Sequence, residues 1–101
     1  MVARAGPPQA VVVSLAAMPD APTLALYHYD SCPYCRRVRT AIDRLGLAVE
    51  LRDIDENPEH LRALMAARGR RTVPVLRIAS EEGAQWMPES ADILRYLEQL
   101  G

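Results

Sequence analysis

The sequence predicts an α/β fold in which helices cover one mixed four-stranded sheet. The chain has 101 residues, of which 50% are hydrophobic and 25% are charged, and this composition is typical of one small domain. Segments with strand and helix periodicity follow in the order βαβ and then ββα. A right-handed strand–helix–strand crossover makes the first two strands parallel, whereas a short turn makes the last two antiparallel.

The first half of the chain predicts a strand, a helix and a second strand. Residues 23–29 are apolar and aromatic and follow two prolines, which indicates a buried strand. Apolar residues then recur at steps of three and four up to Gly46, a typical helix stop. We interpret the arginines off that stripe as the solvated face of the helix. Residues 47–53 alternate apolar and polar side chains and predict the second strand.

The second half predicts a helix, a hairpin and a last helix. Asn57 suits an N-cap, Pro58 the first helical position and Gly69 the stop. The expected apolar face of this helix consists of Leu61, Leu64 and Met65. Three further segments predict a third strand over 73–79, a short fourth strand over 85–87 after a turn, and a helix over 90–100.

The N-terminal residues 1–22 are predicted to form a flexible extension. A short apolar run, Ala10 to Met18, follows only one arginine, whereas a secretory signal carries more positive charge and a small-residue cleavage site. Met18 is an alternative first residue. No window reaches the roughly 18 to 20 apolar residues of a membrane-spanning helix, so we expect no membrane association.

The charge balance and the absence of lysine exclude some classes of partner and of catalytic chemistry. Twelve basic residues stand against thirteen acidic ones, which argues against sequence-independent binding to nucleic acid or to an anionic membrane. All the basic residues are arginine. Lysine chemistry, as a base or as a Schiff-base nucleophile, is therefore excluded, and the expected partners are small molecules or proteins.

The only two cysteines, Cys32 and Cys35, lie three positions apart, so a disulfide between them closes too short a loop to stabilise a fold. Pro33 suits the first helical position and leaves Cys32 at the N-cap, where unpaired N–H groups and the helix dipole favour its thiolate. Cys35 lies one turn later on the apolar stripe. We therefore expect Cys32 to be the nucleophile and Cys35 the more buried resolving thiol.

A zinc site is the main structural alternative for the cysteine pair. Its remaining ligands would be His28 and His60, which are not spaced as a second ligand pair, so we expect no metal. We interpret His28 as a strand residue with satisfied polar atoms, since exchange by an ionised thiol needs no base.

The Cys32-Pro33-Tyr34-Cys35 segment, Thr72-Val73-Pro74 before the third strand, and the βαβ–ββα order resemble glutaredoxins of the thioredoxin superfamily over about residues 23–100. The segment Pro88-Glu89-Ser90 further resembles glutathione transferase N-terminal domains and the glutaredoxins related to them. The resemblance implies a thioredoxin-like glutaredoxin domain over residues 23–101, with helices on both faces of the sheet. Because the sequence stops at Gly101, we expect the helical second domain of those transferases to be absent.

The resemblance also implies a glutathione site. The peptide bond before Pro74 would be cis. The N–H and carbonyl of Val73 would then face the cysteinyl part of glutathione and pair with it as with an added strand. Glu89 and Ser90 would hold the γ-glutamyl end at a helix start, and Arg70 or Arg71 could pair with the glycyl carboxylate. The implied contact residues are Tyr34, Arg71, Thr72, Val73, Pro74, Glu89 and Ser90.

The predicted function is that of a monomeric, cytoplasmic, glutathione-dependent thiol–disulfide oxidoreductase acting on glutathionylated or disulfide-bonded proteins. Glutathione is the expected co-substrate. One alternative is a dimeric iron–sulfur carrier bridged by Cys32 thiolates and two glutathiones. Another is a thioredoxin-type protein that receives electrons from a flavoprotein.

Overall fold

The computed structural model describes residues 22–101, and the predicted N-terminal extension lies outside them except for Pro22. The described chain forms seven elements: β2 (Thr23–His28), α1 (Pro33–Leu45), β3 (Val49–Asp53), α2 (Pro58–Arg68), β4 (Val75–Ser80), β5 (Gly83–Met87) and α3 (Ser90–Leu100).

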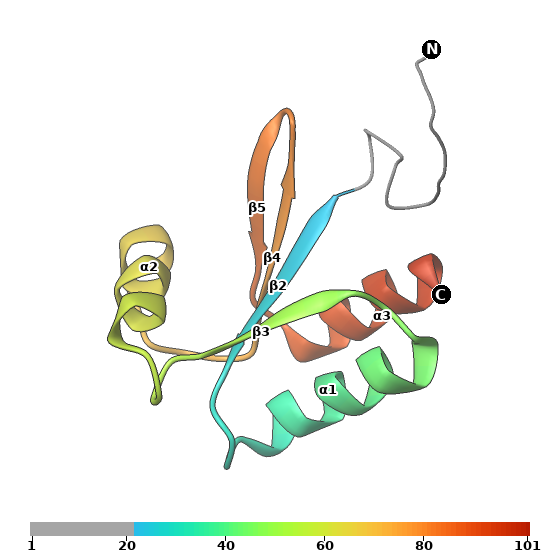
Figure 1. Cartoon of the computed structure of the whole chain (residues 1–101), viewed down its shortest axis with the longest axis horizontal. Helices are drawn as coiled ribbons and strands as arrows, with labels where there is room; N and C mark the ends of the chain where they lie inside the picture. Colours follow the sequence, from blue (N-terminus) through green and yellow to red (C-terminus); the bar gives the residue numbers. More distant parts are fainter. Residues whose placement is uncertain (1–21) are drawn as a thin grey trace.

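The four strands form one sheet in the order β3-β2-β4-β5 (Figure 1). Strand β2 is parallel to β3 and antiparallel to β4, and β4 is antiparallel to β5. This confirms the predicted mixed sheet, with a crossover helix between the parallel strands and a tight turn between the last two.

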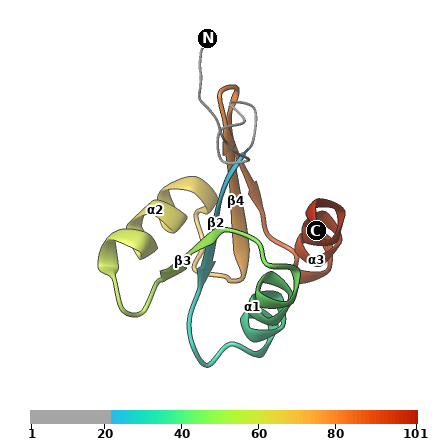
Figure 2. The same cartoon turned by 45° about the vertical axis from the view of Figure 1, so that its right-hand side comes forward.

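Helices cover both faces of the sheet (Figure 2). Helices α1 and α3 lie side by side on one face, and α2 lies on the other. Because side chains alternate along β2, Leu24 and Leu26 pack toward α1 and α3, whereas Ala25 and Tyr27 pack toward α2. The thioredoxin-like fold is thus built around two apolar cores, one on each side of the central strand.

Strand register gathers four chain segments at one edge of the sheet. Tyr27 pairs with Val75, so the end of β2 lies beside the start of β4. The end of β3 lies beside the end of β2, and Met87 at the end of β5 pairs with Leu76 near the start of β4. The turn before α1, the β3–α2 loop, the α2–β4 loop and the start of α3 therefore meet at this edge.

Several local predictions differ from the structure; β5, for example, begins at Gly83 rather than at residue 85. Strand β4 begins at Val75 rather than at residue 73, because Pro74 has no N–H to donate to a ladder. Strand β3 begins at Val49 rather than at residue 47. The sequence predicts Met65 on the apolar face of α2, but it is 42% exposed. Leu64 is the residue of this helix that is fully buried.

No helix within residues 22–101 has both the length and the apolar character that crossing a membrane requires.

Leu26 and Leu51 offer a test of where the fold is stabilised. They are register partners on β2 and β3, but Leu26 is 0% exposed and Leu51 is 47% exposed. We expect Leu26→Ala to lower the free energy of unfolding by about 2–5 kcal/mol through lost burial and the cavity left behind. Leu51→Ala, the matched control, should cost less than about 1 kcal/mol. Urea denaturation followed by circular dichroism measures both, and equal losses would contradict this core.

Candidate functional site

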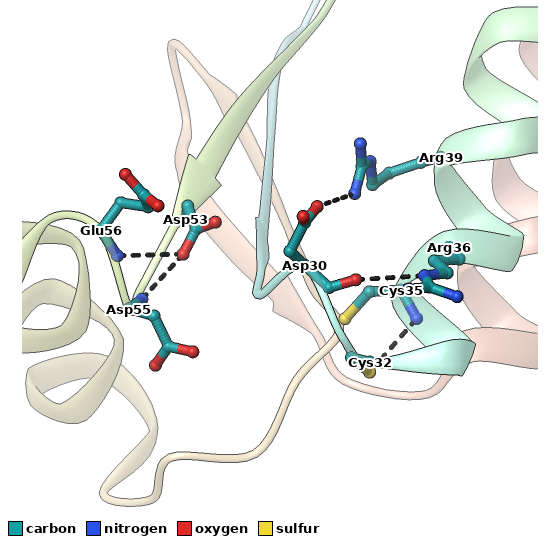
Figure 3. A network of polar contacts seen from close by, with 8 residues as sticks. All are labelled: Asp30, Cys32, Cys35, Arg36, Arg39, Asp53, Asp55 and Glu56. Carbon is teal, nitrogen blue, oxygen red and sulfur yellow. Dashed lines mark hydrogen bonds and ion pairs between the residues drawn. The ribbon is translucent and has the colours of Figure 1, made fainter.

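Cys32 is the N-cap of α1 and Pro33 its first residue, as predicted. The Cys32 backbone is extended, with φ −79° and ψ 115°, and its Sγ accepts a hydrogen bond from the Cys35 N–H at 3.3 Å (Figure 3). The sulfur thus occupies the position that a serine or aspartate oxygen takes in an ordinary cap. Cys32 Sγ thus lies at the N-terminal end of α1, where the positive end of the helix dipole is found.

The two thiols are free but differ in burial and in acidity. Cys32 is 4% exposed and Cys35 is 0% exposed, so the resolving thiol is the deeper one, as expected. Burial, followed by its hydrogen bond with Cys32, raises the pKa of Cys35 to about 12. Cys35 therefore stays protonated near neutral pH until another group takes its proton.

Asp30, in the turn before Cys32, accepts hydrogen bonds from two arginines of α1 (Figure 3). Its carbonyl oxygen accepts from Arg36 Nε at 3.1 Å, and its carboxylate accepts from Arg39 Nη1 at 3.0 Å. The Cys32 N–H donates to the Tyr29 carbonyl at 3.2 Å. The helix periodicity predicts only a solvated face for Arg36 and Arg39, because it does not reveal a partner that precedes the helix.

The Val73–Pro74 peptide bond is cis, as the resemblance implied. Pro74 is buried and Val73 half-buried, directly before the first residue of β4. Within residues 22–101, no main-chain group outside the regular helices and strands bonds to the peptide N–H or carbonyl of Val73. Since the start of β4 and the end of β2 share one edge, this segment and the cysteine turn lie at the same end of the sheet.

The start of α3 reaches this edge as well. Glu89 is its extended N-cap and makes no side-chain cap hydrogen bond, and Ser90 is the first helical residue. Glu89 is exposed and Ser90 half-buried. A helix start without a side-chain cap has N–H groups available for an anion, so these two residues have the placement that the sequence predicted.

Arg71 and Tyr34 of the implied site contact other side chains. Arg71 forms an ion pair with Asp55 at 2.5 Å, and its guanidinium lies 6.0 Å from the ring centre of Tyr29. Tyr34 is 56% exposed, with Arg37 lying 5.9 Å from its ring centre. The structure thus links Arg71 to the β3–α2 loop, which the sequence did not suggest; Arg70 and Thr72 are exposed beside it.

The expectation that the polar atoms of His28 are satisfied is wrong for its ring Nδ1 among the described residues. His28 lies in β2 as expected and is only 4% exposed, but its Nδ1 has no hydrogen-bond partner among residues 22–101. Burial, and then the positive charge of Arg39, lower its pKa. His28 is therefore a buried histidine whose Nδ1 lacks a partner among the described residues, next to Asp53 in the strand register.

The described part of the chain holds no group of three or more His, Cys, Asp or Glu side chains placed to bind a metal ion. The acidic β3–α2 loop instead has an internal structure, in which the Asp53 carboxylate accepts from the N–H groups of Asp55 and Glu56 at 2.8 and 3.1 Å (Figure 3).

Comparison with known proteins points to one family. Residues 26–101 match the family described as glutathione S-transferase, N-terminal domain. Glutaredoxin 2 of Escherichia coli strain K12 is 32% identical over 77 residues, which cover 76% of this chain and 34% of that protein. The chain thus spans about a third of the length of the curated relatives it matches.

Solved structures agree with this assignment. Glutaredoxin 2 of Salmonella typhimurium, in complex with glutathione, has a TM-score of 0.62 at 28% identity and covers 79% of this chain and 34% of its own. Maleylacetoacetate isomerase of Anaeromyxobacter dehalogenans, with bound dicarboxyethyl glutathione and citrate, has a TM-score of 0.61 at 30% identity, with 80% and 38% covered.

The pKa of Cys35 can be tested by alkylation. In Cys32→Ser, Cys35 is the only thiol, and at about pH 8 we expect iodoacetamide to modify it more than about a hundredfold more slowly than a free cysteine, because thiolate is scarce. The rate should still rise about tenfold per pH unit up to about pH 10. The same variant unfolded in guanidinium chloride, the control, should regain ordinary reactivity. A plateau of the native rate below pH 9 would contradict the raised pKa.

Proposed function

Because the chain belongs to the family of glutathione S-transferase N-terminal domains, we propose that it is a glutathione-dependent thiol–disulfide oxidoreductase that works through Cys32 and Cys35. The observation that carries this proposal is the unequal cysteine pair. One sulfur caps α1 at the edge of the sheet, and the other lies fully buried with its pKa raised to about 12. A transferase that only activates glutathione has no need of a resolving thiol.

The proposed first step is an attack by the Cys32 thiolate on the glutathionyl sulfur of a mixed disulfide. A new bond forms between that sulfur and Cys32 Sγ, and the protein substrate leaves as a thiolate that takes a proton from water. A second glutathione thiolate then attacks the same glutathionyl sulfur. Glutathione disulfide leaves, and the Cys32 thiolate returns to its hydrogen bond with the Cys35 N–H.

Reduction of a protein disulfide additionally uses Cys35. Cys32 first forms a mixed disulfide with one substrate sulfur and releases the other as a thiol. Cys35 then gives its proton to water and attacks Cys32 Sγ, which closes the Cys32–Cys35 disulfide and frees the substrate as a thiolate that takes up a proton. Two glutathiones reduce this disulfide in turn, and they leave as one glutathione disulfide. Because the pKa of Cys35 is about 12, little of it is ionised while both cysteines are reduced.

We propose that glutathione lies across the edge where the cysteine turn, the cis-Pro74 segment and α3 meet. The main-chain groups of Val73, which are unpaired within residues 22–101, support an added-strand contact with the cysteinyl part of glutathione. The start of α3 supports binding of the γ-glutamyl carboxylate, with Glu89 accepting from its ammonium group. Arg71 would reach the glycyl carboxylate only by sharing or leaving its ion pair with Asp55.

This proposal concerns the thiol chemistry of this domain, because the chain spans only about a third of the length of its curated relatives. We propose that this domain acts as a monomer in the cytoplasm, where thiols remain reduced.

The roles of the two cysteines predict different mutant phenotypes. Cys32→Ser should lose all turnover of a glutathionylated peptide and of protein disulfides, because it removes the nucleophile. Cys35→Ser should retain deglutathionylation and lose disulfide reduction, because only the second reaction needs a resolving thiol. Coupled assays with glutathione and glutathione reductase measure both. Retained deglutathionylation in Cys32→Ser would refute the assigned nucleophile.

The reductant and the alternative functions can be tested with the same proteins. Wild type should turn over with glutathione and not with thioredoxin reductase; the reverse would assign a thioredoxin-type protein. Colourless, monomeric protein after anaerobic purification is expected. Visible absorbance together with a dimer that Cys32→Ser abolishes would instead indicate a cluster carrier.

Substitutions at the start of α3 test the glutathione site. Ser90→Ala and Glu89→Gln should each raise the KM for glutathione about threefold to tenfold, because each removes one hydrogen bond to a charged group. Ser80→Ala and Glu82→Gln are matched controls, since they lie exposed at the opposite end of β4. An unchanged KM for glutathione in Ser90→Ala and Glu89→Gln would contradict a glutathione site at the start of α3.

A further inference from the structure

An ion pair joins two loops at the edge of the sheet where we place glutathione. Arg71 lies in the α2–β4 loop and Asp55 in the β3–α2 loop, and Arg71 Nη2 is 2.5 Å from Asp55 Oδ1. The two side chains are 54% and 52% exposed, so a ligand in solution can reach both. Within residues 22–101, Arg71 forms no ion pair with another carboxylate.

A second contact places Arg71 beside the cysteine turn. Its guanidinium carbon lies 6.0 Å from the centre of the Tyr29 ring. The carbonyl of Tyr29 accepts the N–H of Cys32 at 3.2 Å. The Arg71–Asp55 pair is therefore connected to the turn that holds the reactive sulfur by two printed contacts, through one intervening residue.

The strand order sets the direction in which the glycyl end of glutathione runs. In the proposed site, the γ-glutamyl end lies at the start of α3, which follows β5, and the cysteinyl part lies along Val73, which precedes β4. The sheet order is β3-β2-β4-β5, so a peptide that continues in the same direction passes the end of β2 and reaches the end of β3. The loop that carries Asp55 begins there. We therefore expect the glycyl carboxylate beside the Arg71–Asp55 pair.

The position of Asp55 is fixed by the turn in which it lies. The carboxylate of Asp53 accepts from the N–H groups of Asp55 and Glu56 at 2.8 and 3.1 Å. Figure 3 shows the carboxylates of Asp55 and Glu56 pointing away from each other. Within residues 22–101, Glu56 forms no ion pair. The turn thus directs one of two neighbouring acidic side chains to Arg71.

We propose that Asp55 is a specificity-determining residue: because it neutralises Arg71, the site needs no free carboxylate at the glycyl end and accepts glutathione blocked there as an amide. This inference rests on the proposed function and adds a class of substrate to it. A guanidinium that is already paired with one carboxylate has little net charge to offer a second. The second carboxylate would also lie close to the negative charge of Asp55, which repels it.

The test uses two mixed disulfides of one fluorescent cysteine peptide, one with glutathione and one with glutathione amide, in which the glycyl carboxylate is a carboxamide. Release of the peptide measures the attack by Cys32, and glutathione regenerates Cys32 in both reactions. The readout is kcat/KM for the glutathione disulfide divided by that for the amide disulfide, so changes in general activity cancel. For the wild type we expect a ratio of about two or less.

Substitutions in the two loops should change this ratio selectively. Asp55→Asn leaves Arg71 without its carboxylate and should raise the ratio to about threefold to fivefold at low salt. Higher salt should lower it again. Adding Arg71→Gln to Asp55→Asn should return the ratio to the wild-type value, because the guanidinium is then gone.

Glu56→Gln is the matched control. It removes one negative charge from the same turn, and the main-chain N–H of Glu56 bonds to Asp53 as that of Asp55 does. Because Glu56 does not pair with Arg71, Glu56→Gln should leave the ratio at the wild-type value. An equal rise in Glu56→Gln and Asp55→Asn would show a general effect of charge and would overturn the role of Asp55.

The outcomes separate this proposal from the function on which it rests. If wild type favours the glutathione disulfide by clearly more than about twofold, or if Asp55→Asn leaves the ratio unchanged, the specificity proposal fails and the oxidoreductase function stands. If wild type releases the peptide from neither disulfide, the proposed function itself fails.

Discussion

The burial of strand β2 on both faces is the constraint on which the rest of the structure depends. Every residue from Leu24 to His28 is buried, because α1 and α3 cover one face and α2 covers the other. Polar reactive groups that need contact with solvent cannot lie along a strand that is buried on both faces. The reactive groups therefore lie just beyond its end, where the chain turns into α1 and can still reach solvent.

The same turn meets two demands at Cys32. A helix start needs an acceptor for its first N–H groups, and a redox site needs a stabilised thiolate. In the proposed function, Cys32 Sγ serves both purposes through its hydrogen bond from the Cys35 N–H. Cys35 meets the opposite condition, since its place on the buried stripe of α1 keeps it protonated. The difference in placement between the two sulfurs follows from a step of three residues along one helix.

Much of this arrangement could be predicted from the sequence because it depends on local rules. Cap and stop residues placed α1 and α2, and the spacing of apolar residues placed α3, within one or two residues of their observed bounds. Interactions between distant segments could not be predicted in this way. The ion pair of Arg71 with Asp55, the exposure of Leu51 on an edge strand and the unsatisfied Nδ1 of His28 each depend on which segments become neighbours.

The sequence by itself determined the elements and their order, the cap position of Cys32 and the place of Cys35 on an apolar stripe, because each depends on residues within one helical turn. Only the tertiary structure decided that the cysteine turn, the cis-Pro74 segment and the start of α3 share one edge, and that Asp55 and Arg71 of two different loops form an ion pair. The physical reason is that strand register and helix packing are set by contacts between residues far apart in the chain, and local periodicity does not record those contacts.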